Sequence, residues 1–238
     1  MKLSQLPKDV LVALALDLDL EYVISLCQTS PIFNEKICQN NNFWLNKLIK
    51  EYGIKTNLSN AKKEYLSLDK LLRTDRNELL EMGIITGNLK MVQRAIEGGA
   101  DPEIKMNLKY QRGDVILNLG HNYYPITISL LFDNDDIINY LLTKLDMSRK
   151  ERILPYLQNV IDFIQDYRLD KIDKCKIFIK FYSIYLPYIA KTQKEMFSSF
   201  WRVVAPKMEE IHKSSDVPCV VSDEFYNKWA NFYKDLSK

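Results

Sequence analysis

The stretch from Glu78 to Ile104 constrains the fold of this chain more than any other part. Two short apolar segments lie on either side of Thr86-Gly87-Asn88, a sequence typical of a tight turn. Apolar residues recur within each segment at intervals of three and four, which is the spacing of one helix face. They are Leu79, Leu80, Met82 and Ile85, and then Leu89, Val92 and Ile96. Gly98-Gly99 follows, where a residue without a Cβ atom readily ends a helix. The pattern predicts two helices joined by a tight turn.

The same stretch is similar to an ankyrin repeat in its Gly87-Asn88-Leu89 turn, its apolar face and its closing Gly99-Ala100-Asp101-Pro102. A second, partial match begins at Tyr124-Pro125-Ile126 and continues through 133–142. The two matches are offset by 46 residues, whereas ankyrin repeats recur about every 33. The resemblance implies an interaction module that is not a catalyst, with about 13 additional residues in the finger between the repeats.

Residues from about 104 to 120 have the pattern of a β-hairpin. Apolar and polar residues alternate on both sides of Gln111-Arg112-Gly113-Asp114, which is typical of a turn. Ankyrin fingers are exposed and commonly hold the partner, so the resemblance implies a partner-binding surface here. The candidate residues are Tyr110, Arg112, His121, Tyr123 and Tyr124. The alternative is that both tyrosines at 123 and 124 pack against the next helix and that Arg112 is a solvated turn residue.

Near the N-terminus, Leu6-Pro7 predicts a helix start, because proline suits the first turn of a helix. Five apolar residues are expected on one face of this helix. They are Val10, Leu11, Leu14, Ala15 and Leu18. Further helices are predicted from about Asp19 to Thr29, from Ser30-Pro31 onward, and through Phe43-Trp44 to Gly53.

This arrangement resembles an F-box. It has a Leu-Pro-x-Asp-Val-Leu opening at 6–11, a Leu-Asp-Leu-x-x-Val-x-x-Leu-Cys segment at 18–27 and a Phe-Trp pair at 43–44. It departs from the family pattern at 27–33, which has neither the usual basic residue nor the usual tryptophan. The resemblance implies docking on a Skp-type adaptor of a cullin-RING ubiquitin ligase. The implied docking residues are Leu6, Pro7, Val10 and Leu11.

An alternative is that these apolar residues form only a helical cap over the ankyrin-like helices. F-box-like and ankyrin segments occur together in large DNA viruses that infect amoebae. The resemblance therefore also implies a viral protein that redirects host ubiquitination.

The predicted fold is all-α apart from the hairpin finger. We expect an F-box-like helical unit at 1–53, a helical connector at 54–74, two ankyrin-like repeats with an elongated finger at 75–147, and a helical C-terminal unit or degenerate repeats at 148–238. Two repeats alone leave apolar faces uncovered, so flanking helices are physically required.

Four cysteines lie within apolar helical patterns and form no Cys-x-x-Cys pair. They are Cys27, Cys38, Cys175 and Cys219. We expect reduced, mostly buried thiols, since the closely spaced ligands of a zinc site are lacking. The acidic residues at 133, 135 and 136 are explained by the positive end of a helix dipole without a metal ion. No cofactor and no metal are expected.

The charges nearly balance, with 33 basic and 31 acidic residues, so no nucleic-acid footprint is present. No apolar run approaches the roughly 20 residues that span a bilayer, and the N-terminus lacks the apolar core of a signal peptide. Motifs of phosphate-binding loops, serine hydrolases and zinc proteases are absent.

We therefore expect a cytoplasmic, non-catalytic adaptor that binds a protein partner and neither a membrane, a nucleic acid nor a small-molecule substrate. The alternatives are a scaffold protein of a virion or another assembly, and an enzyme whose carboxylates assemble from distant residues.

Overall fold

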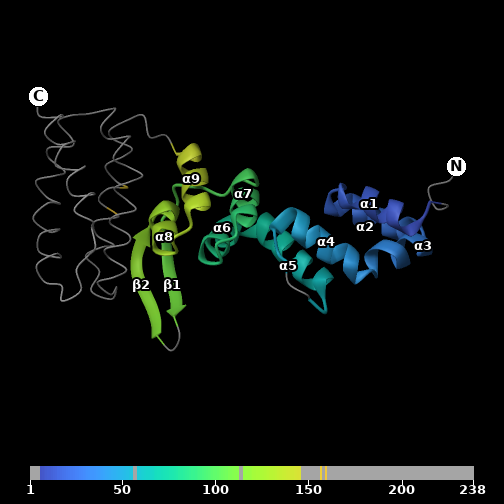
Figure 1. Cartoon of the computed structure of the whole chain (residues 1–238), viewed down its shortest axis with the longest axis horizontal. Helices are drawn as coiled ribbons and strands as arrows, with labels where there is room; N and C mark the ends of the chain where they lie inside the picture. Colours follow the sequence, from blue (N-terminus) through green and yellow to red (C-terminus); the bar gives the residue numbers. More distant parts are fainter. Residues whose placement is uncertain (1–5, 56–57, 113–114, 146–155, 157–158, 160–238) are drawn as a thin grey trace, which may run out of the picture. The chain divides into compact units, whose positions relative to one another are not determined.

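The computed structural model describes residues 6–55, 58–112, 115–145, 156 and 159 (Figure 1). For the strand residues between 108 and 122 it describes the backbone alone. Helices predominate in this part of the chain, as predicted, and a two-stranded sheet accompanies them.

The chain divides into two compact units, Met1–Asp101 and Pro102–Lys238. The first unit therefore combines the parts that the sequence separated into an F-box-like unit, a connector and a first ankyrin-like pair. The predicted C-terminal unit at 148–238 lies outside the described residues, apart from Tyr156 and Asn159.

The first unit begins with a cluster of short helices. They are α1 (Lys8–Leu16), α2 (Leu20–Thr29), α3 (Pro31–Phe33), the π-helix η2 (Asn34–Cys38) and α4 (Asn41–Tyr52). Local sequence sets their ends. The Ser30 hydroxyl accepts a hydrogen bond from the Ile32 amide at the start of α3, and Gly53 ends α4 in the left-handed conformation at a φ of 70°.

Three more helices complete the first unit. They are α5 (Ala61–Thr74), α6 (Arg76–Ile85) and α7 (Leu89–Glu97). Asp75 caps α6 by accepting from the Glu78 amide at 3.0 Å, and Asn88 caps α7 by accepting from the Met91 amide at 3.1 Å. Gly87 makes the turn between them at a φ of 67°. The predicted pair of helices joined by a tight turn is confirmed.

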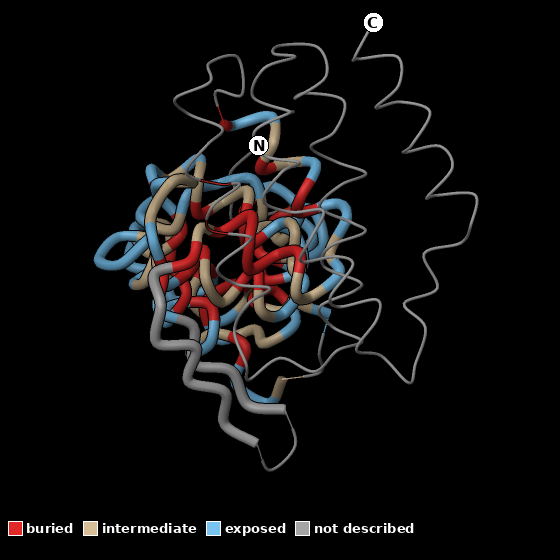
Figure 2. Tube along the Cα trace, turned by 90° about the vertical axis from the view of Figure 1, so that its left-hand side faces the viewer, coloured by how far each residue is buried: buried red, intermediate tan, exposed pale blue. Residues whose placement is uncertain are grey.

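Aromatic side chains fill the centre of the first unit. Trp44 and Tyr65 have ring centroids 5.4 Å apart, Trp44 lies 5.1 Å from Phe43, and Tyr65 lies 5.6 Å from Tyr52. All four are buried, and Figure 2 colours the buried residues of the chain red. Aromatic burial therefore joins α4 of the F-box-like region to α5 of the predicted connector.

Two cysteines differ from the sequence expectation. Cys27 on α2 and Cys38 on η2 form a disulfide, with Cα atoms 6.2 Å apart, so the prediction of reduced thiols is wrong for this pair. Their predicted burial is confirmed. The pairing depends on the packing of α2 against η2, which a separation of eleven positions in sequence does not reveal. Cys175 and Cys219 lie outside the described residues.

The second unit contains the predicted β-hairpin. Strands β1 (Met106–Arg112) and β2 (Val115–Tyr123) pair in antiparallel register, from Arg112 opposite Val115 at the tip to Met106 opposite Tyr123 at the base. An irregularity interrupts the ladder between Asn107 and Lys109, so β2 runs longer than β1 and beyond the predicted end near 120.

Two helices follow the hairpin. They are α8 (Pro125–Leu131) and α9 (Asp135–Lys144), and they pack against each other. Proline at the first position starts α8, as the Tyr124-Pro125-Ile126 pattern predicted. Residues from Pro125 to Leu130 are all buried, so α8 is the central element of the described part of this unit.

Candidate protein interaction surface

Helix α1 is apolar on both of its sides. Leu11 and Ala15 are buried, whereas Val10 and Leu14, on the adjoining side of the helix, have 43% and 52% of their surface exposed. The predicted apolar face is therefore buried along Leu11 and Ala15 and exposed along Val10, Leu14 and Leu18. Every residue of 10–16 is apolar, so residue spacing could not identify the buried side.

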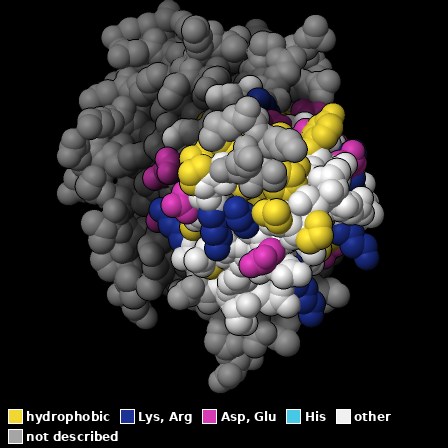
Figure 3. Space-filling view, turned by 90° about the vertical axis from the view of Figure 1, so that its right-hand side faces the viewer, with side chains coloured by type: hydrophobic (Ala, Val, Ile, Leu, Met, Phe, Trp, Pro, Cys, Tyr) yellow, Lys and Arg dark blue, Asp and Glu magenta, His cyan; other side chains and the backbone are white. Residues whose placement is uncertain are grey.

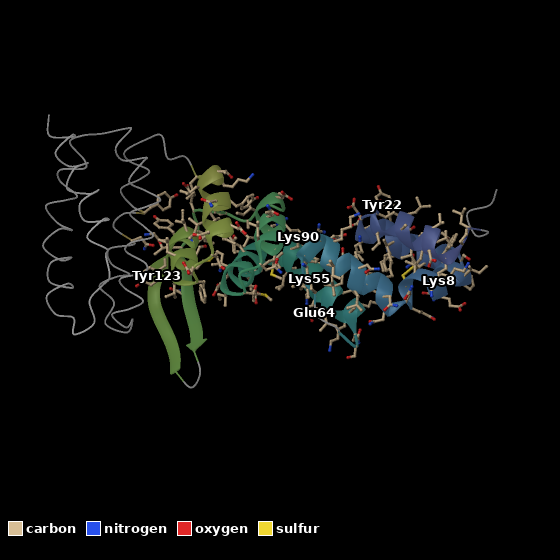
Figure 4. The ribbon with its side chains drawn as sticks, in the orientation of Figure 1. Lys8, Tyr22, Lys55, Glu64, Lys90 and Tyr123 are labelled. Carbon is tan, nitrogen blue, oxygen red and sulfur yellow. A yellow bond between two sulfur atoms is a disulfide. The ribbon has the colours of Figure 1, made fainter. Side chains whose placement is uncertain are left out.

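Four exposed apolar side chains recur at every fourth position along α1 and α2. They are Val10, Leu14, Leu18 and Tyr22, and we call them the exposed row. Val10 and Leu14 lie one turn apart on α1, while Leu18 follows the end of that helix. Tyr22 projects outward from α2 and is 65% exposed (Figure 4).

Figure 3 looks onto this end of the chain and shows hydrophobic side chains gathered there. Single exposed apolar residues are normal on protein surfaces, but grouped ones mark interaction sites. The exposed row is therefore the strongest candidate for a binding surface among the described residues.

The residues predicted to dock on an adaptor divide into two groups. Pro7 and Val10 are exposed and Leu6 is half-buried, so these three are accessible at the start of α1. Leu11 is buried, because α1 turns that side toward the interior, and it offers no surface to a partner in this conformation. Leu14, Leu18 and Tyr22 were not predicted as binding residues. A helix that is apolar on every side has more apolar surface than one core contact needs, and this could have indicated a second contact surface on α1.

Two lysines of α4 hold the C-terminal end of α1. The Lys47 ammonium, fully buried, donates to the Leu18 carbonyl at 2.7 Å. Lys50 pairs with the Asp17 carboxylate and lies 3.4 Å from the Leu16 carbonyl. The hydrogen bond from Lys50 lowers the pKa of Asp17. Cations suit the carbonyl end of a helix, so these contacts fix the exposed row against α4.

Charged pairs lie at the edge of the row. Arg73 of α5 donates at 2.8 Å both to Glu21, next to Tyr22, and to Asp69 on its own helix. The hydrogen bonds from Arg73 to Glu21 and Asp69 raise the pKa of the guanidinium. The Glu21 pair is exposed and contributes little stability, but it ties the start of α2 to α5.

Lys47 also belongs to a largely buried polar network whose centre is Glu51. Its carboxylate pairs with Lys47, accepts from the Tyr65 hydroxyl at 2.6 Å and lies 2.6 Å from the Arg94 guanidinium. The network joins α4, α5 and α7, because one residue or more comes from each. Burial, together with the bond to Glu51, raises the pKa of Tyr65 well above its usual range. Both carboxylate oxygens of Glu51 are therefore paired, and the network ties the three helices together.

The predicted finger residues are distributed along the hairpin. Tyr110 and Arg112 belong to β1, and His121 belongs to the longer β2; their side chains lie outside what the structure describes. Tyr123 is 1% exposed, as in the alternative that placed it against neighbouring structure, and it offers no surface to a partner in this conformation. Tyr124 is half-buried and packs edge-on against Tyr156, with ring centroids 4.6 Å apart.

Other kinds of site find no support in the described part of the chain. No group of three or more histidine, cysteine, aspartate or glutamate side chains there could hold a metal ion. The helices in the same residues are too short or too polar to cross a bilayer. Comparisons with known protein families, with curated proteins and with solved structures find no match to this chain.

Proposed function

We propose that this chain is a non-catalytic interaction protein that binds a protein partner through the exposed row. The observation that carries the proposal is the exposure of Val10, Leu14, Leu18 and Tyr22 along α1, α2 and the turn between them, which Lys47 and Lys50 of α4 hold in place. Burying a large aliphatic side chain stabilises by about 1.5–3 kcal/mol, so a partner that covered this row would gain substantial binding energy. A rigid surface also loses little conformational entropy on binding.

We further propose that the partner is a Skp-type adaptor of a cullin-RING ubiquitin ligase. The support is the F-box-like opening, of which Leu6, Pro7 and Val10 are accessible and lead directly into the exposed row. In this arrangement α1 serves two purposes, since Leu11 and Ala15 hold it to the unit while Val10 and Leu14 face the adaptor. The second unit, with its hairpin, is then available to bind a protein that the ligase modifies.

The test is capture of the purified chain on an immobilised recombinant Skp-type adaptor. The variant Val10→Asp/Leu14→Asp places two carboxylates in the contact and should reduce capture by at least 10-fold. Leu66→Asp is the matched control, because Leu66 on α5 is similarly exposed, at 37%, and lies outside the row. Capture that falls equally in both variants, or in neither, would remove the adaptor assignment.

A scaffold function uses the same surface differently. An apolar row that is open to solvent can also pair with a second copy of the chain, as in a structural assembly. Light scattering distinguishes the two, since a scaffold forms oligomers that Val10→Asp/Leu14→Asp dissociates, whereas an adaptor remains monomeric until its partner is added.

A further inference from the structure

The disulfide between Cys27 and Cys38 joins the two elements that support the exposed row. Cys27 lies on the inner side of α2, the helix whose outer side carries Tyr22. Cys38 ends η2, which packs against both α1 and α2. The bond therefore connects the helix that presents part of the row to the segment on which the row rests.

Different contacts hold the two ends of this bond. The Cys38 carbonyl accepts a hydrogen bond at 2.9 Å from the indole of Trp44, whose side chain is buried in the aromatic core. Helix α2 buries Val23 and Cys27, and Glu21 at its start forms an exposed pair with Arg73. A change at the disulfide will therefore move α2 more than it moves Cys38.

The segment that contains Cys38 is a short helix of mixed geometry. Helix α3 has three residues and the π-helix η2 has five, so no regular helix longer than one or two turns holds residues 31–38. Short helices and π-helices are weak elements that occur often at functional positions. Because both sulfurs are buried, their reaction with a small reagent requires local opening of this segment.

We propose that Cys27 and Cys38 form a reversible redox pair that controls the position of α2 and thereby the exposed row. In the oxidising direction, the Cys27 thiolate attacks a small-molecule disulfide and releases one small thiolate. The Cys38 thiolate then attacks the sulfur of Cys27 in this mixed disulfide and releases the second. The two cysteines lose two electrons and two protons, and the small disulfide becomes two thiols; the reverse exchange reduces the pair.

The two states differ in the packing beneath the row. Bonded sulfurs lie closer together than two thiols can, so reduction must separate α2 from η2 or rotate their side chains. Because the interior is close-packed, we expect either change to move α2, and with it Tyr22 relative to Val10 and Leu14. An effect of the redox state on partner binding rests on the proposed docking function. The redox cycle itself does not depend on that function.

The test uses the full chain with Cys175→Ser/Cys219→Ser, which leaves Cys27 and Cys38 as the thiols that respond. The protein is equilibrated in a series of reduced and oxidised glutathione mixtures, alkylated, and analysed by mass spectrometry. We expect the pair to pass from dithiol to disulfide within the series. Thiols that stay reduced in every mixture, or a bond that survives every mixture, would overturn the proposal.

Hydrogen exchange on the two end states tests the structural consequence. Amides of α2 should exchange at least 10-fold faster in the dithiol form, while those of α6 and α7 stay unchanged. Cys27→Ser/Cys38→Ser should reproduce the dithiol pattern in both reducing and oxidising buffer. Equal exchange of α2 in the two states would overturn the control of the row. If the pair cycles and changes the exchange of α2, but no adaptor captures the chain, the docking function is refuted and the redox proposal is not.

Discussion

Replacing Glu51 by glutamine should destabilise the first unit more than any other single exchange of a carboxylate in it. The Glu51 carboxylate is contacted by Lys47, Tyr65 and Arg94. The Lys47 side chain has no exposed surface, so water cannot compensate its charge. Glutamine keeps the shape but removes the negative charge, and its amide group would face a cationic donor. The substitution therefore leaves one ammonium and one guanidinium close together without a counter-charge.

The expected cost is about 3 kcal/mol. Breaking a buried ion pair by removing one partner costs roughly 3–5 kcal/mol, and the lower end applies because Arg94 is partly exposed, at 30% of its side chain. Three kcal/mol corresponds to about a 100-fold change in an equilibrium constant. Amides of α4 and α5 that exchange through opening of the unit should therefore exchange about 100-fold faster.

Native-state hydrogen exchange followed by mass spectrometry measures this directly. Glu64→Gln is the matched control, because Glu64 is an exposed residue of α5 (Figure 4) and its replacement should change stability by less than about 0.5 kcal/mol. The double variant Lys47→Met/Glu51→Leu should recover part of the loss, since it removes the stranded charge together with its partner. Equal exchange in Glu51→Gln and Glu64→Gln would refute the view that this network holds the three helices together.

Three further substitutions have directions that the structure fixes. Burial, with Glu78 and Asp75 nearby, raises the pKa of Glu81 above 4.5, so the folded state binds its proton more tightly than the unfolded state does. Ionised Glu81 therefore destabilises the folded state at neutral pH. In denaturant titrations, Glu81→Gln should raise the free energy of unfolding at pH 7 but not at pH 4. A gain at both pH values would contradict this cause. Gly83→Ala should cost about 1–3 kcal/mol in the same titrations, because the new Cβ would lie 2.8 Å from the Val92 side chain and 2.9 Å from its backbone nitrogen; a neutral result would show that α6 and α7 do not pack so closely. Asn88→Ala should cost about 2 kcal/mol, since it removes the cap of α7 and the 2.7 Å bond to the Tyr52 carbonyl; loss of the cap alone would cost about half as much.

Helix ends were predictable because their causes are local. Ser30, Asp75 and Asn88 each cap the helix that follows within three residues, and Gly53 ends α4 at a position where a side chain would strain the backbone. The hairpin was predictable for a similar reason, since alternation and a short turn lie within one stretch of chain. Its exact end was not, because the irregularity in the ladder depends on pairing across the strands.

The features that define the candidate surface depend on contacts between distant residues. Which side of α1 is buried depends on α4 and η2, because the helix itself is apolar all round. The disulfide requires that α2 and η2 meet, and the network around Glu51 brings in Arg94, 43 positions away. Sequence patterns with a period of two or 3.6 residues carry no information about contacts between elements that are distant in sequence.

The most direct measurement of the docking proposal is a hydrogen-exchange footprint of the chain saturated with a recombinant Skp-type adaptor. We expect slower exchange across α1 and the start of α2, from Lys8 to Tyr22, and unchanged exchange in α6 and α7. The Leu66→Asp variant should give the same footprint, and Val10→Asp/Leu14→Asp should give none. Protection that appears elsewhere in the chain, or none at saturating adaptor, would contradict the assignment of the exposed row as the docking surface.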